Sequence, residues 1–148
     1  MLRTGQKHEK ETARQSWQLL VFSVGGRRLA MKTWDVLGIS QWHDPIPVAG
    51  RTPFVTAVIR QGTTVLPVFD LAASIHLTVQ GSSPLCLTVK HPLGEMAMCI
   101  DEDIPVLHTC DPTGIQTYQG KDVPAEGSYI NGLDEIPILS VSRLGSTV

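Results

Sequence analysis

Histidine and cysteine are the residue types in this sequence that would suit a metal or thiol site. His108 and Cys110 form an H-x-C pair, and His91, Cys86 and Cys99 stand elsewhere in the chain. A structural zinc ion needs four such ligands within tetrahedral reach, and tight C-x-x-C or H-x-x-x-H pairs usually supply them. These spacings are loose, and two of the cysteines interrupt apolar runs, where free cysteine behaves as a small hydrophobe. We therefore expect reduced, partly buried thiols, no metal site and no cofactor.

Two other segments have residue types that bind ions. Asp101-Glu102-Asp103 would suit a cation, but calcium loops need ligands at alternating positions and a glycine, so we expect a solvated loop. Gly25-Gly26 followed by Arg27-Arg28 would suit phosphate, but phosphate loops open onto a helix, and here the next segment has the pattern of a strand. A hairpin turn is the better interpretation. The strand-turn motif G-x-S-x-G of serine hydrolases is absent, and the sequence predicts no enzyme.

Composition narrows the class of protein. The 148 residues include 12 basic and 14 acidic side chains, a net charge of −2 that offers no basic field for nucleic acid. No apolar run reaches 18 residues, so no membrane insertion is expected. Residues 1–16 are polar and read as a flexible tail, while residues 17–148 form one domain. Three cysteines without an export signal indicate the cytoplasm.

Short β-like runs separated by turn residues dominate the chain, and no stretch keeps apolar residues at helical spacing for three turns. The pattern therefore predicts an all-β barrel or sandwich. Single-turn helices are expected at 71–75 and 141–144, preceded by Asp70 and Ser140 as caps. Four hairpins are expected, with strands at 18–24 and 27–31, 55–59 and 63–69, 84–89 and 95–100, and 129–132 and 135–139.

An internal repeat is visible in these hairpins. Phe54-Val55-Thr56-Ala57 before a Leu66–Leu71 strand parallels Tyr129-Ile130-Asn131-Gly132 before Ile136–Val141, with a shorter turn in the second copy. Pro67 and Pro137 match within these blocks and are expected on sheet edges or at bulges, because proline donates no ladder hydrogen bond. Leu29-Ala30-Met31 likewise corresponds to Met96-Ala97-Met98. Each half forms a curled sheet of about five strands, too small to seal its own core, so the halves must pack together.

Aromatic residues in this pattern allow two interpretations. Trp34, Trp42 and Ile46 lie between the first two hairpins, where they either anchor a protein partner or seal one end of a barrel. Phe54 is expected to begin a core strand, so Phe54→Ala is expected to destabilise the protein more than Trp42→Ala.

Several segments together resemble the CheW-like family, the adaptors of bacterial chemotaxis signalling. The likeness runs from about Trp17 to Leu144. Its most specific segments are Pro47-Val48-Ala49-Gly50, Pro53-Phe54-Val55-Thr56-Ala57-Val58-Ile59, Gly62, and Val65-Leu66-Pro67-Val68-Phe69-Asp70-Leu71. The order and spacing of these segments match the family's P-V-P-G turn, its first hairpin strand, its R-G turn and its proline-bearing strand.

The resemblance implies two five-stranded, SH3-like β-barrel subdomains, interleaved in one domain and packed on a shared hydrophobic core. It implies a non-catalytic adaptor that couples chemoreceptor cytoplasmic tips to the regulatory domain of a CheA-type histidine kinase, without metal or cofactor. Carried onto this sequence, the partner-binding positions are Val36, Ile39, Trp42, Arg60 and Gln61.

This sequence departs from the family pattern at three places, one of which is Ala57, where the family has a glycine. The turn before Gly62 has only Arg60-Gln61, one residue fewer than the usual N-L-R-G, so the family's arginine is either Arg60, shifted, or missing. A family glutamate falls on Gly38. Two alternatives remain open: a regulatory module on the same fold that senses a small molecule or metal, and an adaptor of a non-flagellar array that controls pili or a second messenger.

Overall fold

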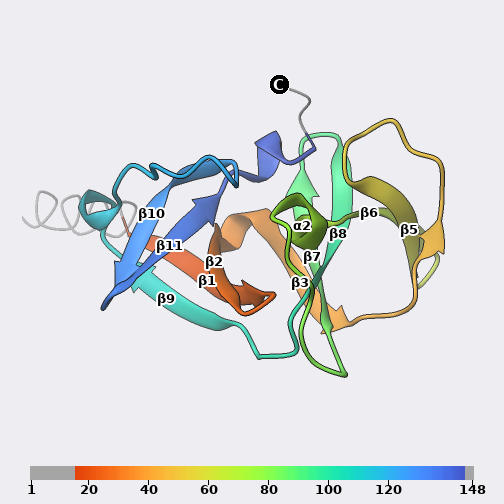
Figure 1. Cartoon of the computed structure of the whole chain (residues 1–148), viewed down its shortest axis with the longest axis horizontal. Coiled ribbons are helices and arrows are strands. Elements are labelled where there is room, and N and C mark those ends of the chain that lie inside the picture. Colours follow the sequence, from red (N-terminus) through yellow and green to blue (C-terminus); the bar gives the residue numbers. More distant parts are fainter. Residues whose placement is uncertain (1–15, 146–148) are drawn as a thin grey trace, which may run out of the picture.

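The computed structural model describes residues 16–145, and its fold is all-β, as predicted (Figure 1). All but the last residue of the expected tail at 1–16 lie outside the described residues. Among residues 16–145 there is no helix long and apolar enough to cross a membrane.

The four predicted hairpins form, and the structure has three further strands that the sequence pattern does not predict. In chain order the elements are β1 (Trp17–Val24), β2 (Arg27–Lys32), η1 (Thr33–Asp35), β3 (Val36–Gln41), β4 (Ile46–Pro47), β5 (Val55–Gln61), β6 (Thr64–Phe69), α2 (Leu71–Ser74), β7 (Leu85–His91), β8 (Gly94–Ile100), β9 (Val106–Cys110), η2 (Pro112–Gly114), β10 (Ala125–Asn131), β11 (Asp134–Leu139) and η3 (Val141–Arg143).

The strands form two curled sheets that lie side by side. The first barrel has five strands in the order β10-β11-β2-β1-β9, and the second has six in the order β3-β7-β8-β6-β5-β4. The sixth strand, β4, is only two residues long. Figure 1 shows the first barrel on the left and the second on the right, with α2 between them. Two small β-subdomains are therefore confirmed.

Each repeat contributes strands to both barrels. The hairpin β1–β2 stays in the first barrel, whereas β3 to β6, which follow it, pair in the second. The hairpin β7–β8 stays in the second barrel, and β9 to β11 return to the first. Two parallel junctions join the exchanged parts, with Ile138 opposite Ala30 and Val68 opposite Ala97. The predicted equivalence of the two alanine-centred segments is confirmed by this register.

The prolines lie in interior strands, so the expected edge position is wrong. Pro67 is in β6, between β5 and β8, and Pro137 is in β11, between β10 and β2. Each proline is next to a residue that forms the single registered pair of a parallel junction, Val68 or Ile138. Each also lies close to a register shift in the antiparallel neighbour strand, β5 or β10. A missing N–H is tolerated there because few ladder bonds form at such a junction.

Register also corrects the detailed alignment of the repeat. Ile59 faces Leu66 and Tyr129 faces Ile136, so Tyr129 corresponds to Ile59 and not to Phe54. The two turns have equal length, with Gly62 and Gly132 at φ of 62° and 65°, and the expected shorter second turn is wrong. The amide of Asp70 donates to the Phe54 carbonyl and that of Ser140 to the Pro124 carbonyl, both at 2.8 Å. Phe54 therefore corresponds to Pro124.

Three apolar clusters stabilise this arrangement. The largest lies between the barrels and takes residues from both, including Phe22, Met31, Leu87 and Met98, with α2 and η3 adding Leu71 and Val141 at its edge. Each barrel also has its own interior cluster, of five buried residues in either case. The shared hydrophobic core is therefore confirmed, and it is larger than either interior.

Asp101 corrects the expected solvated loop. Its side chain is 2% exposed and accepts hydrogen bonds from the amides of Gly25, Gly26 and Gln80, each at 2.8 Å. The glycine pair thus forms a hairpin turn, and its amides hold the protein's own carboxylate. At φ of 62° a side chain on Gly25 would be strained, and a Cβ there would come within 2.6 Å of Leu77. The hydrogen bonds to Asp101 tie the β1–β2 turn to the segment between β8 and β9.

Phe54 is not a core residue, because 43% of it is exposed and β5 begins only at the next residue. Its φ of 62° places the ring away from the strand, in edge-to-face contact with Phe69. Trp42 is half-buried and packs against the interior cluster of the second barrel. The premise for ranking Phe54→Ala as more damaging than Trp42→Ala is therefore wrong.

Candidate partner-binding site

Four of the five predicted partner-binding residues lie on strands or segments that meet at one open seam of the second barrel. Ile39 is on β3 and Trp42 directly follows that strand, while Arg60 and Gln61 end β5. The Gln61 side-chain amide is 3.4 Å from the Ser40 hydroxyl, a long hydrogen bond across the seam. We name this region, Ile39–Trp42 with Arg60–Gly62, the β3–β5 seam. Val36 lies apart from it, packed against the inter-barrel core.

The strand pattern explains how the seam presents its side chains. Ile59 points into the barrel and is buried, so Arg60, the next residue along β5, points outward. The Arg60 Nε donates to the Gly62 carbonyl at 3.0 Å, which holds the guanidinium over its own turn. The shortened turn therefore leaves an exposed arginine at this position.

A small cavity of about 160 Å³ opens at the seam. It is lined by outer residues such as Gln41 and His43 and by Ile59 and Cys86 from the interior. Burial raises the pKa of the Cys86 thiol, and the neighbouring hydroxyls of Thr88 and Ser40 lower it by less. The cavity thus reaches two residues of the barrel interior, and the raised pKa keeps the Cys86 thiol protonated.

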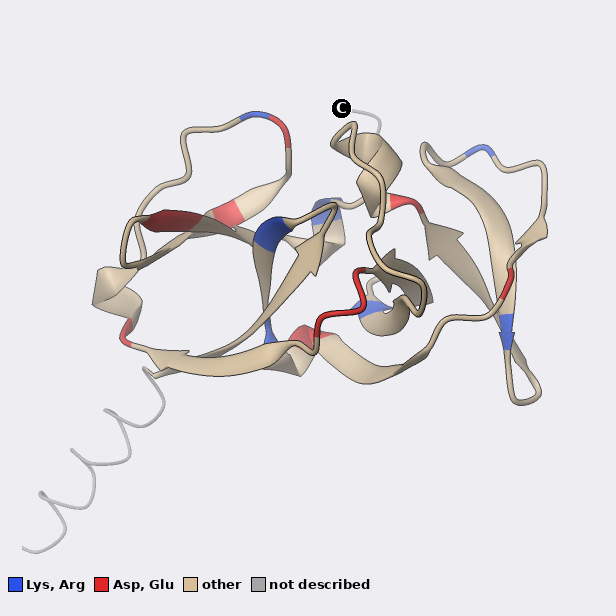
Figure 2. Ribbon diagram, turned by 60° about the horizontal axis from the view of Figure 1, so that its bottom comes forward, with Lys and Arg blue, Asp and Glu red and all other residues tan. Residues whose placement is uncertain are grey.

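The surface beside the seam is apolar and poor in charge. Ile39 is 42% exposed, and further exposed apolar side chains follow the same part of the chain: Trp34, Leu37, Ile46 and Val48. Figure 2 shows charged residues more densely around the first barrel than along β3 to β6. Because β3 is also an edge strand, its outer backbone groups have no ladder partner in the second sheet. Exposed apolar side chains at a free edge are typical of a protein interface.

Gly38, where the family pattern has a glutamate, occupies a register shift of β3. A Cβ built at this position meets no atom within 4 Å. The backbone therefore has room for a side chain here, and the glycine leaves this stretch of the edge bare.

Trp34 is held in place by a cation. The Lys32 ammonium lies 5.0 Å from the ring centre of Trp34 and 5.4 Å from that of Trp17, and it pairs with Glu126 at 2.6 Å. The two indole rings meet edge to face at 6.2 Å. Cation–π contacts of this kind fix an exposed ring without burying it. Trp34 thus packs the segment between β2 and β3 against the first barrel and stays exposed.

The histidines and cysteines do not converge. No group of three or more His, Cys, Asp or Glu side chains placed to hold a metal occurs within residues 16–145. His108 and Cys110 share β9, but the His108 ring lies tilted against the Tyr129 ring, with 5.6 Å between ring centres, and Cys110 packs against the first barrel's interior. The pKa of Cys99 is raised to about 12, and burial is the largest cause of this shift. Burial also raises the pKa of Cys110.

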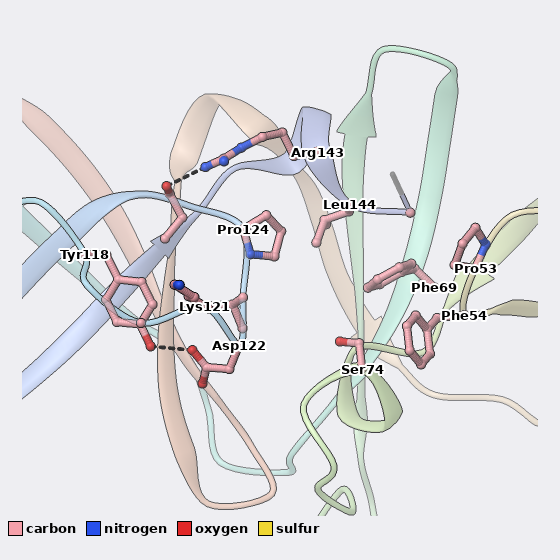
Figure 3. A pocket seen from close by; sticks show the side chains of 14 residues that line it. Pro53, Phe54, Phe69, Ser74, Tyr118, Lys121, Asp122, Pro124, Arg143 and Leu144 are labelled. Carbon is pink, nitrogen blue, oxygen red and sulfur yellow. Dashed lines mark hydrogen bonds between the residues drawn. The ribbon is translucent and has the colours of Figure 1, made fainter. Parts of the chain in front are cut away.

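A larger cavity at the junction of the barrels has no counterpart in the sequence reasoning (Figure 3). Its volume is about 560 Å³, and the segments before β5 and β10 line it from opposite sides. Phe54 and Phe69 form one side, and Tyr118, Lys121 and Asp122 form the other. The sequence pattern around Phe54 predicts the start of a buried strand and gives no sign of this cavity.

Comparison with known proteins gives a consistent result. The family model described as the CheW-like domain matches residues 18–147. The chemotaxis protein CheW of Bacillus subtilis (strain 168) is 33% identical over 60 residues, which are 40% of this chain and 38% of that protein. The crystal structure of the scaffolding protein TtCheW from Thermoanaerobacter tengcongensis superposes with a TM-score of 0.73 at 16% identity, covering 86% of this chain and 91% of that one.

Proposed function

Because this chain belongs to the CheW-like domain family, we propose that it is a cytoplasmic, non-catalytic adaptor of a bacterial chemosensory array. In this proposal it couples the tip of a chemoreceptor to the regulatory domain of a CheA-type histidine kinase. The family match over nearly the whole described chain carries the proposal. The names of the two similar proteins, one a chemotaxis protein and one a scaffolding protein, support it.

The β3–β5 seam is the proposed docking site for one of these partners. Ile39 would enter the partner's surface, and the Arg60 guanidinium at the rim would orient it through charge. Leu37, on the same strand as Ile39, is a further exposed apolar residue. Val36 is not placed in this docking site, because its side chain faces the inter-barrel core.

Binding to purified partners tests the proposal. The kinase regulatory domain and a chemoreceptor tip from the same organism would be titrated separately against the full chain. We expect Kd values in the micromolar range for at least one of them. A Kd of tens of micromolar corresponds to a binding free energy of about −6 to −7 kcal/mol. If neither partner binds at concentrations up to this range, the adaptor function is contradicted.

A matched pair of variants tests the site. Ile39 and Ile130 are the same residue type, lie on different barrels and are 42% and 39% exposed. Ile39→Asp is expected to weaken binding of one partner about tenfold or more, whereas Ile130→Asp leaves both affinities within about twofold. Equal effects of the two substitutions would place docking elsewhere while leaving the adaptor function intact.

A sensing role remains the second candidate, and the cavity between the barrels favours its small-molecule form. The metal form has less support, since the described thiols and imidazoles do not gather.

A further inference from the structure

The cavity at the junction of the barrels is built by the duplication. Phe54 and Pro124 occupy corresponding places before β5 and β10, as the matching hydrogen bonds to their carbonyls show. Both residues line the cavity, as do Phe69 at the end of β6 and Leu144 after η3. An occupant would therefore contact both barrels at once. Its volume of about 560 Å³ falls within the range of about 300–1,000 Å³ that small-molecule sites take.

Sequence divergence has made the two walls chemically different (Figure 3). On the side of the second barrel the wall is aromatic, with Phe54 and Phe69 in edge-to-face contact at 6.2 Å between ring centres. On the side of the first barrel the wall carries Lys121 and Arg143. An aromatic wall facing a cationic wall suits a ligand with a flat apolar body and an acidic group.

The cations of the first wall are available. No hydrogen bond or ion pair of Lys121 is found within residues 16–145. Arg143 donates through one nitrogen to the Ala125 carbonyl, and a guanidinium has five N–H donors. Both cations line the cavity, and each has N–H donors that no described residue uses.

The acid in the same wall is already neutralised. Asp122 pairs with Arg27 and accepts a hydrogen bond from the Tyr118 hydroxyl at 2.7 Å. Partial burial opposes ionisation, but the hydrogen bonds from Arg27 and Tyr118 outweigh it and lower the pKa of Asp122. The carboxylate therefore stays paired, and the net charge beside the cavity remains positive.

Phe54 supplies an independent observation. A positive φ is unfavourable for a bulky side chain and costs of order 1–3 kcal/mol. Here it presents a large apolar ring to the cavity, where 43% of the residue is exposed. Strained residues of this kind gather at binding sites, where the strain fixes a side chain in the position that a ligand needs.

We propose that the inter-barrel cavity is a binding site for a small aromatic anion, whose ring lies against Phe54 and whose acidic group is bound by Lys121 and Arg143. Contact with both barrels makes such a ligand a stabiliser of their junction. The proposal is independent of the adaptor function, since it concerns the protein without partners.

Titration of the full chain with phenyl phosphate tests the proposal, with inorganic phosphate and benzylamine as comparison probes. Amide chemical shifts report both affinity and location. We expect phenyl phosphate to bind with a Kd of about 1 mM or tighter and to shift the amide signals of Phe54 and of the non-proline residues among 118–125. Inorganic phosphate is expected to bind at least tenfold more weakly because it lacks the ring, and benzylamine is expected not to bind because its charge is reversed.

Variants separate this site from general attraction of anions. Lys121→Gln is expected to weaken phenyl phosphate at least fivefold, and Phe54→Leu to weaken it while leaving inorganic phosphate unchanged. The control is Lys90→Gln, an exposed lysine that does not line this cavity. Three outcomes would each overturn the proposal. They are no binding at a phenyl phosphate concentration of about ten times the expected Kd, equal affinity for phenyl and inorganic phosphate, and equal loss of affinity in the Lys121 and Lys90 variants.

Discussion

The two barrels have corresponding strands but are closed in different ways. In the first, the chain after η2 forms two backbone hydrogen bonds with β10, between Gln116 and Ser128 at 2.7 and 3.0 Å, which link the two edges of the sheet. In the second, the side chains of Gln61 and Ser40 make one long contact across the β3–β5 seam. The barrel that is less tightly closed is the one that presents the predicted partner-binding residues.

The interiors differ at corresponding positions. Val21 faces Ala30 in the first barrel, and Thr88 faces Ala97 in the second. Leu19 likewise corresponds to Cys86, so the second interior has smaller and more polar side chains. The Thr88 hydroxyl is buried and makes no hydrogen bond of ordinary geometry. It lies close enough to the Cys86 thiol to lower the pKa of that thiol slightly.

The turns of the β1–β2 and β7–β8 hairpins differ as well. Asp101 holds the first turn by its amides, whereas Leu93 in the second turn is 91% exposed. The ion pairs found among the described residues, Arg27–Asp122 and Lys32–Glu126, both belong to the first barrel. Duplication therefore preserved the strand pairing, while sequence divergence concentrated the fixed polar contacts in the first barrel, where they join residues of both repeats.

The largest expected effect tests the anchored turn. Asp101→Ala leaves three backbone amides without their acceptor, and we expect the free energy of unfolding to fall by about 3 kcal/mol or more. Asp103→Ala is the control, because Asp103 is exposed, and it is expected to change stability by less than about 0.5 kcal/mol. Urea unfolding measures both, and similar values for the two variants would show that the anchor is unimportant.

The parallel junctions test how tightly each interior is filled. Ala30 and Ala97 are both fully buried at corresponding positions. Adding two methyl groups overpacks either site, and we expect Ala30→Val to cost about 2 kcal/mol. Ala97→Val is expected to cost about 1 kcal/mol, because its neighbours are smaller. Chemical unfolding of both variants checks the order, and a larger loss for Ala97→Val would reverse this view of the interiors.

The buried hydroxyl of the second barrel gives a smaller effect of opposite sign. Thr88→Val keeps the shape of the side chain and removes an unpaired polar atom, so we expect a gain of about 1 kcal/mol in unfolding free energy. Its mirror, Val21→Thr, is expected to lose about as much. Thermal unfolding followed by circular dichroism measures the pair, and a lower melting temperature for Thr88→Val would mean that the hydroxyl is satisfied in solution.

The cysteines give an effect on reactivity with no change in stability. Burial, the largest cause, raises the pKa of Cys99 to about 12, so at pH 8 only about one molecule in ten thousand carries the thiolate there. We expect iodoacetamide to modify Cys110 in the first barrel before Cys99 in the second. Mass spectrometry of timed samples, with urea-unfolded protein as the reference for full reactivity, measures the order. Faster modification of Cys99 would contradict the order that burial predicts.

Local pattern determined much of this fold. The four hairpins were predictable because alternating apolar residues on either side of Gly25-Gly26 or Gly62 specify both strands and their turn. The paired prolines and the alanine-centred segments revealed the repeat, since they occupy corresponding places at the parallel junctions. Strands β3 and β9 were missed because their exposed apolar residues, such as Leu37 and Leu107, break the inward–outward alternation.

Tertiary structure alone decided which strands share a sheet. Pairing of β9 with β1 and of β3 with β7 joins segments distant in sequence, and no local preference encodes it. The same long-range packing buried Asp101 within an acidic run and turned Phe54 outward beside Lys121. The sequence by itself thus determined the repeated hairpins and the family, because short-range alternation and turn chemistry are read locally. The seam, the anchored turn and the inter-barrel cavity exist only because strands are exchanged between the two barrels, which brings together residues from both ends of the chain.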